Sequence, residues 1–177
     1  MDKTAKTIGY LGAVHLLGLL ALTACRLGLL FANAPEEGIL WALASRALLI
    51  GIKFDNLIAS YIVALPCIVL PVLSLCLEKS GKYASFMRAA AQVSAWWFGI
   101  LYSAAIFIGV ANARYFHFFE NHLNISVTEW FGFVGDTAGL VFGDFINWIF
   151  LCIAIGLIVL YIFALHRITI MYQSLIA

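Results

Sequence analysis

Four long apolar stretches dominate the hydrophobic pattern of the chain, at about residues 8–32, 57–77, 89–111 and 145–165. A helix that crosses the hydrocarbon core of a bilayer needs about 20 predominantly apolar residues, and each stretch has that length. The first stretch is much longer than the apolar region of a cleavable signal peptide, which is about 7–15 residues, so we expect it to remain as a spanning helix. The pattern predicts four transmembrane helices.

Two shorter apolar stretches lie between these spans. Residues 38–52 are interrupted by Arg46, and residues 130–142 are interrupted by Asp136. Both are too short to cross the bilayer alone, so we expect helices that lie in the interface or are partly re-entrant. The alternative fuses each stretch to the span that follows it, giving long, tilted helices. The predicted fold is therefore all-α: a single transmembrane domain over residues 1–177, with four transmembrane helices plus two interfacial or re-entrant helices.

Composition agrees with a membrane location and excludes other classes of protein. Hydrophobic residues make up 64% of the chain and charged residues 11%, whereas a soluble domain has about 25% charged residues. The formal net charge is +1, from 10 basic and 9 acidic residues. This balance leaves no basic surface for nucleic acid, so the expected partners are membrane lipids.

The distribution of basic residues predicts the orientation of the spans. Basic residues near the ends of spans are retained on the cytoplasmic side of a membrane. With the N-terminus inside, the cytoplasmic side holds Lys3, Lys6, Lys79, Lys82, Arg88 and Arg167. The other side then holds Arg26, Arg46, Lys53 and Arg114. This excess, and the compact basic turn over residues 78–88, predict that both termini are cytoplasmic.

Five polar residues flank the second and third spans on the outer side and form the candidate site. Lys53 and Asp55 enter the second span, and Asn112, Arg114 and Tyr115 leave the third. We expect them to form a lipid head-group site or a structural polar cluster. Asp55 and Arg114 should lie close together, because consecutive antiparallel spans joined by a short inner turn are neighbours. In the rival interpretation Asp55 caps its own helix, while Arg114 faces lipid phosphate or anchors the span at the interface.

Signals of a self-contained enzyme site are absent from the sequence. It has no P-loop, no H-E-x-x-H motif and no nucleophile elbow, and no dense Asp/His cluster that would hold a catalytic metal. His15 is an ionisable residue within the first span, but a lone histidine without a carboxylate at matching depth is weak support for a proton relay. The sequence therefore predicts neither catalytic residues nor a metal site.

Two short motifs carry a resemblance to a known family. The first is Gly51-Ile-Lys-Phe-Asp55 before a proline-containing span, and the second is Val110-Ala-Asn-Ala-Arg-Tyr-Phe116 at the end of the next span. Together they resemble the N-terminal membrane domain of lipoteichoic-acid-synthase-like proteins, especially the forms found in Bacteroidetes. These are phosphoglycerol and phosphoethanolamine transferases of the alkaline phosphatase/sulfatase superfamily. Family members often carry an acidic residue in the second motif, where this chain has Arg114.

The resemblance implies a role in the bacterial cell (inner) membrane. Family members have about five spans and a large extracytoplasmic domain, which carries a threonine or similar nucleophile and Mn or another divalent metal. The chain would then be the membrane-anchoring, lipid-presenting domain of such a transferase, with its C-terminal catalytic domain absent from the given sequence. No catalytic residue and no cofactor is implied in this chain. The alternative is a standalone small membrane protein that acts as a partner subunit or as a transporter of a small solute.

Overall fold

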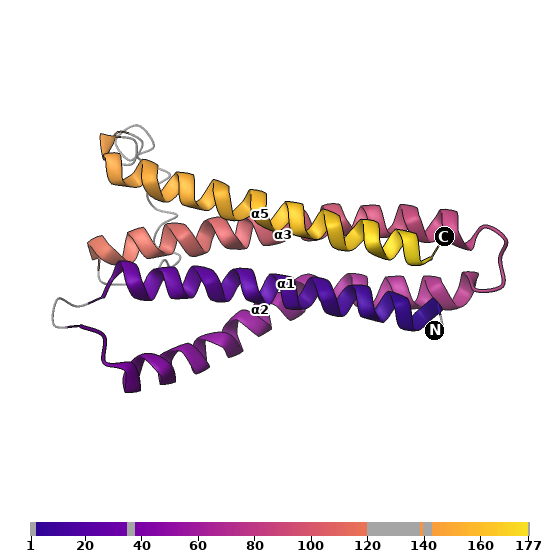
Figure 1. The fold of residues 1–177 in the computed structure, drawn as a ribbon, viewed down its shortest axis with the longest axis horizontal. Coiled ribbons are helices and arrows are strands. Elements are labelled where there is room, and N and C mark those ends of the chain that lie inside the picture. The colour runs from indigo at the N-terminus through magenta and orange to yellow at the C-terminus, as the bar shows by residue number, and fades with distance from the viewer. Residues whose placement is uncertain (1–2, 35–37, 120–138, 140–142, 177) are drawn as a thin grey trace.

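The computed structural model describes residues 3–34, 38–119, 139 and 143–176. Four long helices make up almost all of this part of the chain: α1 (Lys3–Ala32), α2 (Trp41–Leu77), α3 (Tyr83–Phe119) and α5 (Phe145–Leu175). Each is long and apolar enough to cross a membrane. They run side by side as an elongated bundle (Figure 1). The prediction of an all-α bundle with four spanning helices is confirmed.

The separate interfacial helix predicted over residues 38–52 is not present. Helix α2 is continuous from Trp41 to Leu77, over 37 residues, so the fused alternative describes this segment correctly. The physical reason is that residues 52–57 contain no proline, so every backbone N–H there can stay in the helical hydrogen-bond pattern. Asp55, which was considered as a cap, lies inside the helix and bonds to a neighbouring helix instead. The second predicted segment, residues 130–142, lies outside the described residues except for residue 139.

Helices α1 and α3 form the centre of the bundle. They contact each other, and both contact α2 and α5, whereas α2 and α5 do not touch within the described part of the chain. The two central helices approach closely at Gly18, where an added Cβ would lie 2.1 Å from the ring of Tyr102. The ring of Tyr102 is fully buried. A residue without a side chain is therefore required at this contact, as is common where membrane helices pack.

Both termini and the turn between α2 and α3 lie at one end of the bundle, which we name the termini end (Figure 1). There Lys3 Nζ donates a hydrogen bond to the carbonyl of Glu78 at 3.0 Å, and Lys6 Nζ donates to the carbonyl of Leu175. These carbonyls belong to the C-terminal ends of α2 and α5, where the helix dipole favours a cation. The first turn of α1 therefore ties together the ends of two other helices.

Buried hydroxyl groups connect the helices in the half next to the termini end. The hydrogen-bonded pairs are Thr7 with Tyr172 at 2.9 Å, Tyr10 with Ser94 and with Thr169 at 3.4 Å each, and Ser74 with Tyr83 at 3.0 Å. These residues are contributed by all four helices. Because each hydroxyl has a partner on another helix or turn, the burial of these polar groups is compensated.

Helix α2 bends in its middle, so that its first half diverges from the bundle (Figure 1). Pro66 lies inside α2 and has no N–H, which leaves the carbonyl of Ile62 without its donor in the helix. The indole Nε1–H of Trp97 donates to that carbonyl at 2.9 Å. This contact explains why a tryptophan lies deep within the third span, far from an interfacial belt. It also fixes α3 to α2 at the bend.

Candidate polar site at the opposite end of the bundle

The first ion pair at the end opposite the termini joins α1 to α2. Arg26 donates from Nε to Asp55 Oδ2 at 3.0 Å and from Nη2 to Asp55 Oδ1 at 2.7 Å, a bidentate geometry. The side chain of Asp55 is 5% exposed and that of Arg26 is 30% exposed. One helical turn before Asp55, Gly51 leaves room for the arginine, because a Cβ there would lie 2.3 Å from Arg26 Cδ. The glycine thus permits the pair to form.

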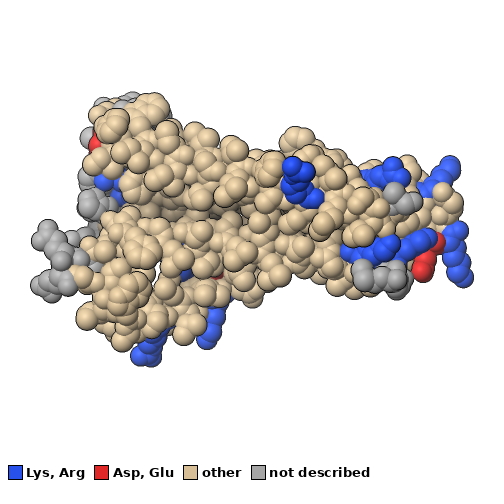
Figure 2. All heavy atoms as spheres, viewed as in Figure 1, with Lys and Arg blue, Asp and Glu red and all other residues tan. Residues whose placement is uncertain are grey.

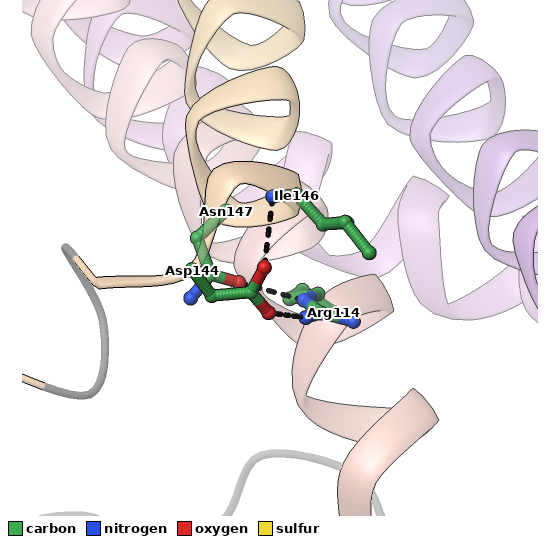
Figure 3. Close-up of polar contacts among 4 residues, drawn as sticks. All are labelled: Arg114, Asp144, Ile146 and Asn147. Atoms are coloured by element: carbon green, nitrogen blue, oxygen red, sulfur yellow. Dashed lines mark hydrogen bonds and ion pairs between the residues drawn. The ribbon is translucent and has the colours of Figure 1, made fainter.

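The second ion pair joins α3 to α5 (Figure 3). Arg114 Nη2 bonds to Asp144 Oδ2, and Arg114 Nε donates to Asn147 Oδ1 at 2.6 Å. The other oxygen of Asp144 accepts the backbone N–H of Ile146 at 2.9 Å, so Asp144 is also the N-cap of α5. The arginine side chain is 12% exposed and the aspartate side chain 35% exposed. One carboxylate therefore both starts a helix and holds a cation.

The two pairs lie at similar depths along the bundle. Helices α1 and α3 run in the same direction, and Gly109 of α3 packs against Cys25 of α1, where a Cβ on the glycine would meet Cys25 Cβ at 3.2 Å. Arg26 follows that contact by one residue and Arg114 by five. At about 1.5 Å per residue, their Cα atoms differ in depth by about 6 Å, or roughly one turn. Both guanidinium groups therefore belong to the same end of the protein.

The structure gives Asp55 and Arg114 different partners from the predicted ones. Asp55 pairs with Arg26, and Arg114 pairs with Asp144, in place of the expected Asp55–Arg114 pair. The reason is the bend in α2. Described hydrogen bonds link α3 to α2 at Ile62 and at Ala59, on the side of Asp55 that faces the termini end. Beyond that point α2 diverges, and the neighbour of Asp55 is α1.

The other predicted site residues fall in two places. Asn112 and Tyr115 are half-buried on α3, next to Arg114. Lys53 is exposed on α2. It lies two positions before Asp55, which is about 200° around a helix, so it points away from the Arg26–Asp55 pair. The structure therefore does not bring the five predicted residues into one cluster, since Asp55 and Arg114 belong to separate pairs and Lys53 to neither.

Three residues of the site were missed by the sequence analysis: Arg26, Asp144 and Asn147. A signal for the first was present, since an arginine inside an apolar span requires a partner in the bundle. A signal for Asp144 was also present, because an aspartate directly before an apolar helical stretch is a typical N-cap. Asn147 follows from Asp144, because it lies on the first turn of the same helix. His15, the other ionisable residue noted in the spans, shares a hydrogen bond with Asn56 Oδ1 at 3.0 Å.

The chemistry available at this end is recognition by charge and hydrogen bonding. Among the residues that the structure describes, no group of three or more His, Cys, Asp or Glu side chains could hold a metal ion. The guanidinium group presents donors in a planar fork, which matches carboxylate and phosphate oxygens. Arg26 and Arg114 use this fork on carboxylates, and a lipid phosphate offers the same acceptor geometry.

The four long apolar helices indicate a membrane protein of the helical-bundle class. No protein-family model, curated protein or solved structure matches the chain. The resemblance to lipoteichoic-acid-synthase-like membrane domains therefore stays a prediction from the two sequence motifs.

Proposed function

We propose that this bundle is the membrane-anchoring, lipid-presenting domain of a phosphoglycerol or phosphoethanolamine transferase of the sulfatase superfamily. The chemical step would be carried out by groups other than the described helices. The support is the resemblance of residues 51–55 and 110–116 to the family's membrane domain, together with four apolar helices. The location that this function requires is a bacterial inner membrane.

The observation that carries the proposal is the pair formed by Arg114 with Asp144. The carboxylate of Asp144 is one-third exposed, while the arginine is mostly buried and held from a second side by Asn147. A phosphate from a lipid head group can approach the same fork and share or replace the aspartate. Asn112 and Tyr115 are half-buried on the same segment of α3. The bound phosphodiester would then be held at the outer surface.

Retention of a lipid by the purified protein tests the proposal. Full-length protein extracted in mild detergent should retain phosphatidylglycerol, detected by native mass spectrometry. Arg114→Gln should lose it, and Arg114→Lys should retain it more weakly because the bidentate fork is lost. Arg167→Gln, an exposed residue nearer the termini end, is the matched control and should behave as the parent. Equal retention by the Arg114→Gln variant would contradict a lipid site at this arginine.

The proposed orientation places both termini in the cytoplasm. It is supported by the gathering of lysine and arginine side chains around the termini end (Figure 2), where cytoplasmic loops carry an excess of basic residues. A membrane-impermeant thiol reagent on intact cells checks it, after the native cysteines have been replaced. Ser45→Cys should react and Ser80→Cys should not, and the reverse pattern would invert the proposal.

A further inference from the structure

We name the first half of α2, residues 41–56, the α2 arm. Helix α2 has 37 residues, which corresponds to about 55 Å, whereas the hydrocarbon core of a bilayer is about 30 Å thick. Residues 57–77 alone extend about 31 Å and already cross it. The α2 arm therefore continues about 24 Å beyond the length that a spanning helix needs.

The α2 arm contacts α1 through Gly51 and Asp55, and its remaining surface is largely apolar. It diverges from the other helices on one side of the molecule (Figure 1). Large hydrophobic side chains remain exposed along it, namely Trp41, Leu43, Leu49, Ile50, Ile52 and Phe54. Such a surface is unfavourable in water and favourable at the boundary between head groups and acyl chains, where helices with mixed apolar and basic residues lie. The composition of the arm therefore suits a position at the boundary of the bilayer.

Two cations share one face of the α2 arm. Arg46 and Lys53 are both exposed, and seven positions correspond to about two turns, so the side chains project within about 20° of each other. Ala44 and Gly51, which are buried, lie two positions before each cation. The cations therefore point away from the buried side of α2. Within the described residues neither forms an ion pair with a carboxylate, and basic groups protrude from this side of the molecule in Figure 2.

We propose that Arg46 and Lys53 together bind phosphates of anionic phospholipids in the outer leaflet and hold the α2 arm in the head-group layer. The charges are complementary, and long basic side chains reach the phosphates while their stems stay in the apolar region. This proposal rests on the proposed function in one respect: the orientation given there places the α2 arm in the outer leaflet. This surface differs from the proposed site at Arg114, because it would contact lipids that exchange freely and would not hold one lipid in a defined position.

A fluorophore on the α2 arm tests this binding. The native cysteines of the full-length protein are replaced, and a fluorophore is attached at Ser45→Cys. The labelled protein is placed in vesicles in which either phosphatidylglycerol or phosphatidylcholine carries a quencher on its head group. The labelled phosphatidylglycerol should quench several-fold more than the phosphatidylcholine. We call the ratio of quenching by phosphatidylglycerol to quenching by phosphatidylcholine the preference. Arg46→Gln and Lys53→Gln should each lower this ratio about fivefold, and the ratio should not fall below one. Added salt should lower it as well.

Control variants separate this surface from other sources of lipid binding. The pair Lys79→Gln with Lys82→Gln removes two charges at the termini end, and the preference at position 45 should stay at the parent level. Equal quenching by both lipids in the parent protein, or no quenching by either, would overturn the proposal. Arg114→Gln can also be measured in both experiments. If it loses phosphatidylglycerol retention while quenching at position 45 is unchanged, both the proposed function and this inference are supported, each by its own measurement. Retention that persists in Arg114→Gln would contradict only the proposed function.

Discussion

The two ends of the bundle contain different kinds of polar contact between helices. Near the termini end, neutral hydroxyl groups pair across helices, and Lys3 and Lys6 bond to the carbonyls of helix ends. At the opposite end, two charged pairs each join two helices, Arg26 with Asp55 and Arg114 with Asp144. Neutral interhelical hydrogen bonds in membranes are worth about 0.6 kcal/mol on average, whereas breaking a buried ion pair costs several times as much.

The two halves of the bundle therefore differ in the number and strength of the polar contacts that hold them together. The termini end depends on many weak contacts, so no single one is decisive. The opposite end depends on a few strong contacts to charged groups, which a lipid phosphate can also make. Between the two lie the contact of Gly18 with Tyr102 and the bend at Pro66. Substitutions along the bundle should therefore differ in size according to the half they affect.

The largest effect is expected at the central contact, with Gly18→Ala. The new Cβ would lie 2.1 Å from the fully buried ring of Tyr102, so either this ring or the two helices must shift. Overpacking of this kind costs about 1–3 kcal/mol, and we expect the upper part of that range. Thermal unfolding in detergent measures it. Gly12→Ala, where nothing lies within 4 Å of the new atom, is the control and should leave stability equal or slightly higher. Equal effects of the two variants would mean that the contact does not limit packing.

The next effect is expected at the charged end, with Asp55→Asn. It leaves Arg26 without its counter-ion, and because the arginine is 30% exposed we expect a loss of about 2 kcal/mol, below the full cost for a buried pair. Arg26→Gln should lose a similar amount, and the double variant should lose less than the sum of the two. Arg46→Gln, on the exposed side of the same helix, should change stability by less than about 0.5 kcal/mol. Additive losses at Asp55 and Arg26 would show that the residues are not coupled.

The fold was largely predictable from the sequence because span length is a local property. Each apolar stretch long enough to cross a bilayer became a helix. The partner of Asp55 was not predictable, because it depends on the direction α2 takes after its bend. Pro66 and Pro71 both lie within this helix, but a sequence does not state the angle of a bend. The continuity of α2 through residues 52–57 was only the alternative prediction, because polar residues there interrupt the apolar pattern, whereas the structure pairs Asp55 with Arg26.

A smaller effect is expected at the bend itself, with Trp97→Phe. The carbonyl of Ile62 loses the indole donor that replaces the N–H missing at Pro66, and an unsatisfied buried carbonyl costs about 1 kcal/mol or somewhat more. Pro66→Ala restores a backbone donor to that carbonyl. In the Pro66→Ala background, Trp97→Phe should therefore cost less than in the parent, as measured by thermal unfolding. The same loss in both backgrounds would exclude a compensating role for the indole. Trp96→Phe, at the neighbouring exposed residue, is the control.

The smallest effect is expected among the hydroxyl pairs, with Tyr172→Phe. Only the hydroxyl is removed, and the ring that stacks on Tyr10 at 4.6 Å between centroids remains. The partner, Thr7, also bonds to the carbonyl of Lys3 at 3.2 Å, so it is not left unsatisfied. We therefore expect a loss near the average for interhelical hydrogen bonds in membranes, about 0.6 kcal/mol. Tyr61→Phe, an exposed tyrosine on α2, should change nothing measurable. If Tyr172→Phe cost as much as Asp55→Asn, the two ends of the bundle would be equally dependent on single polar contacts. The distinction between a half held by many weak bonds and a half held by two charged pairs would then have to be abandoned.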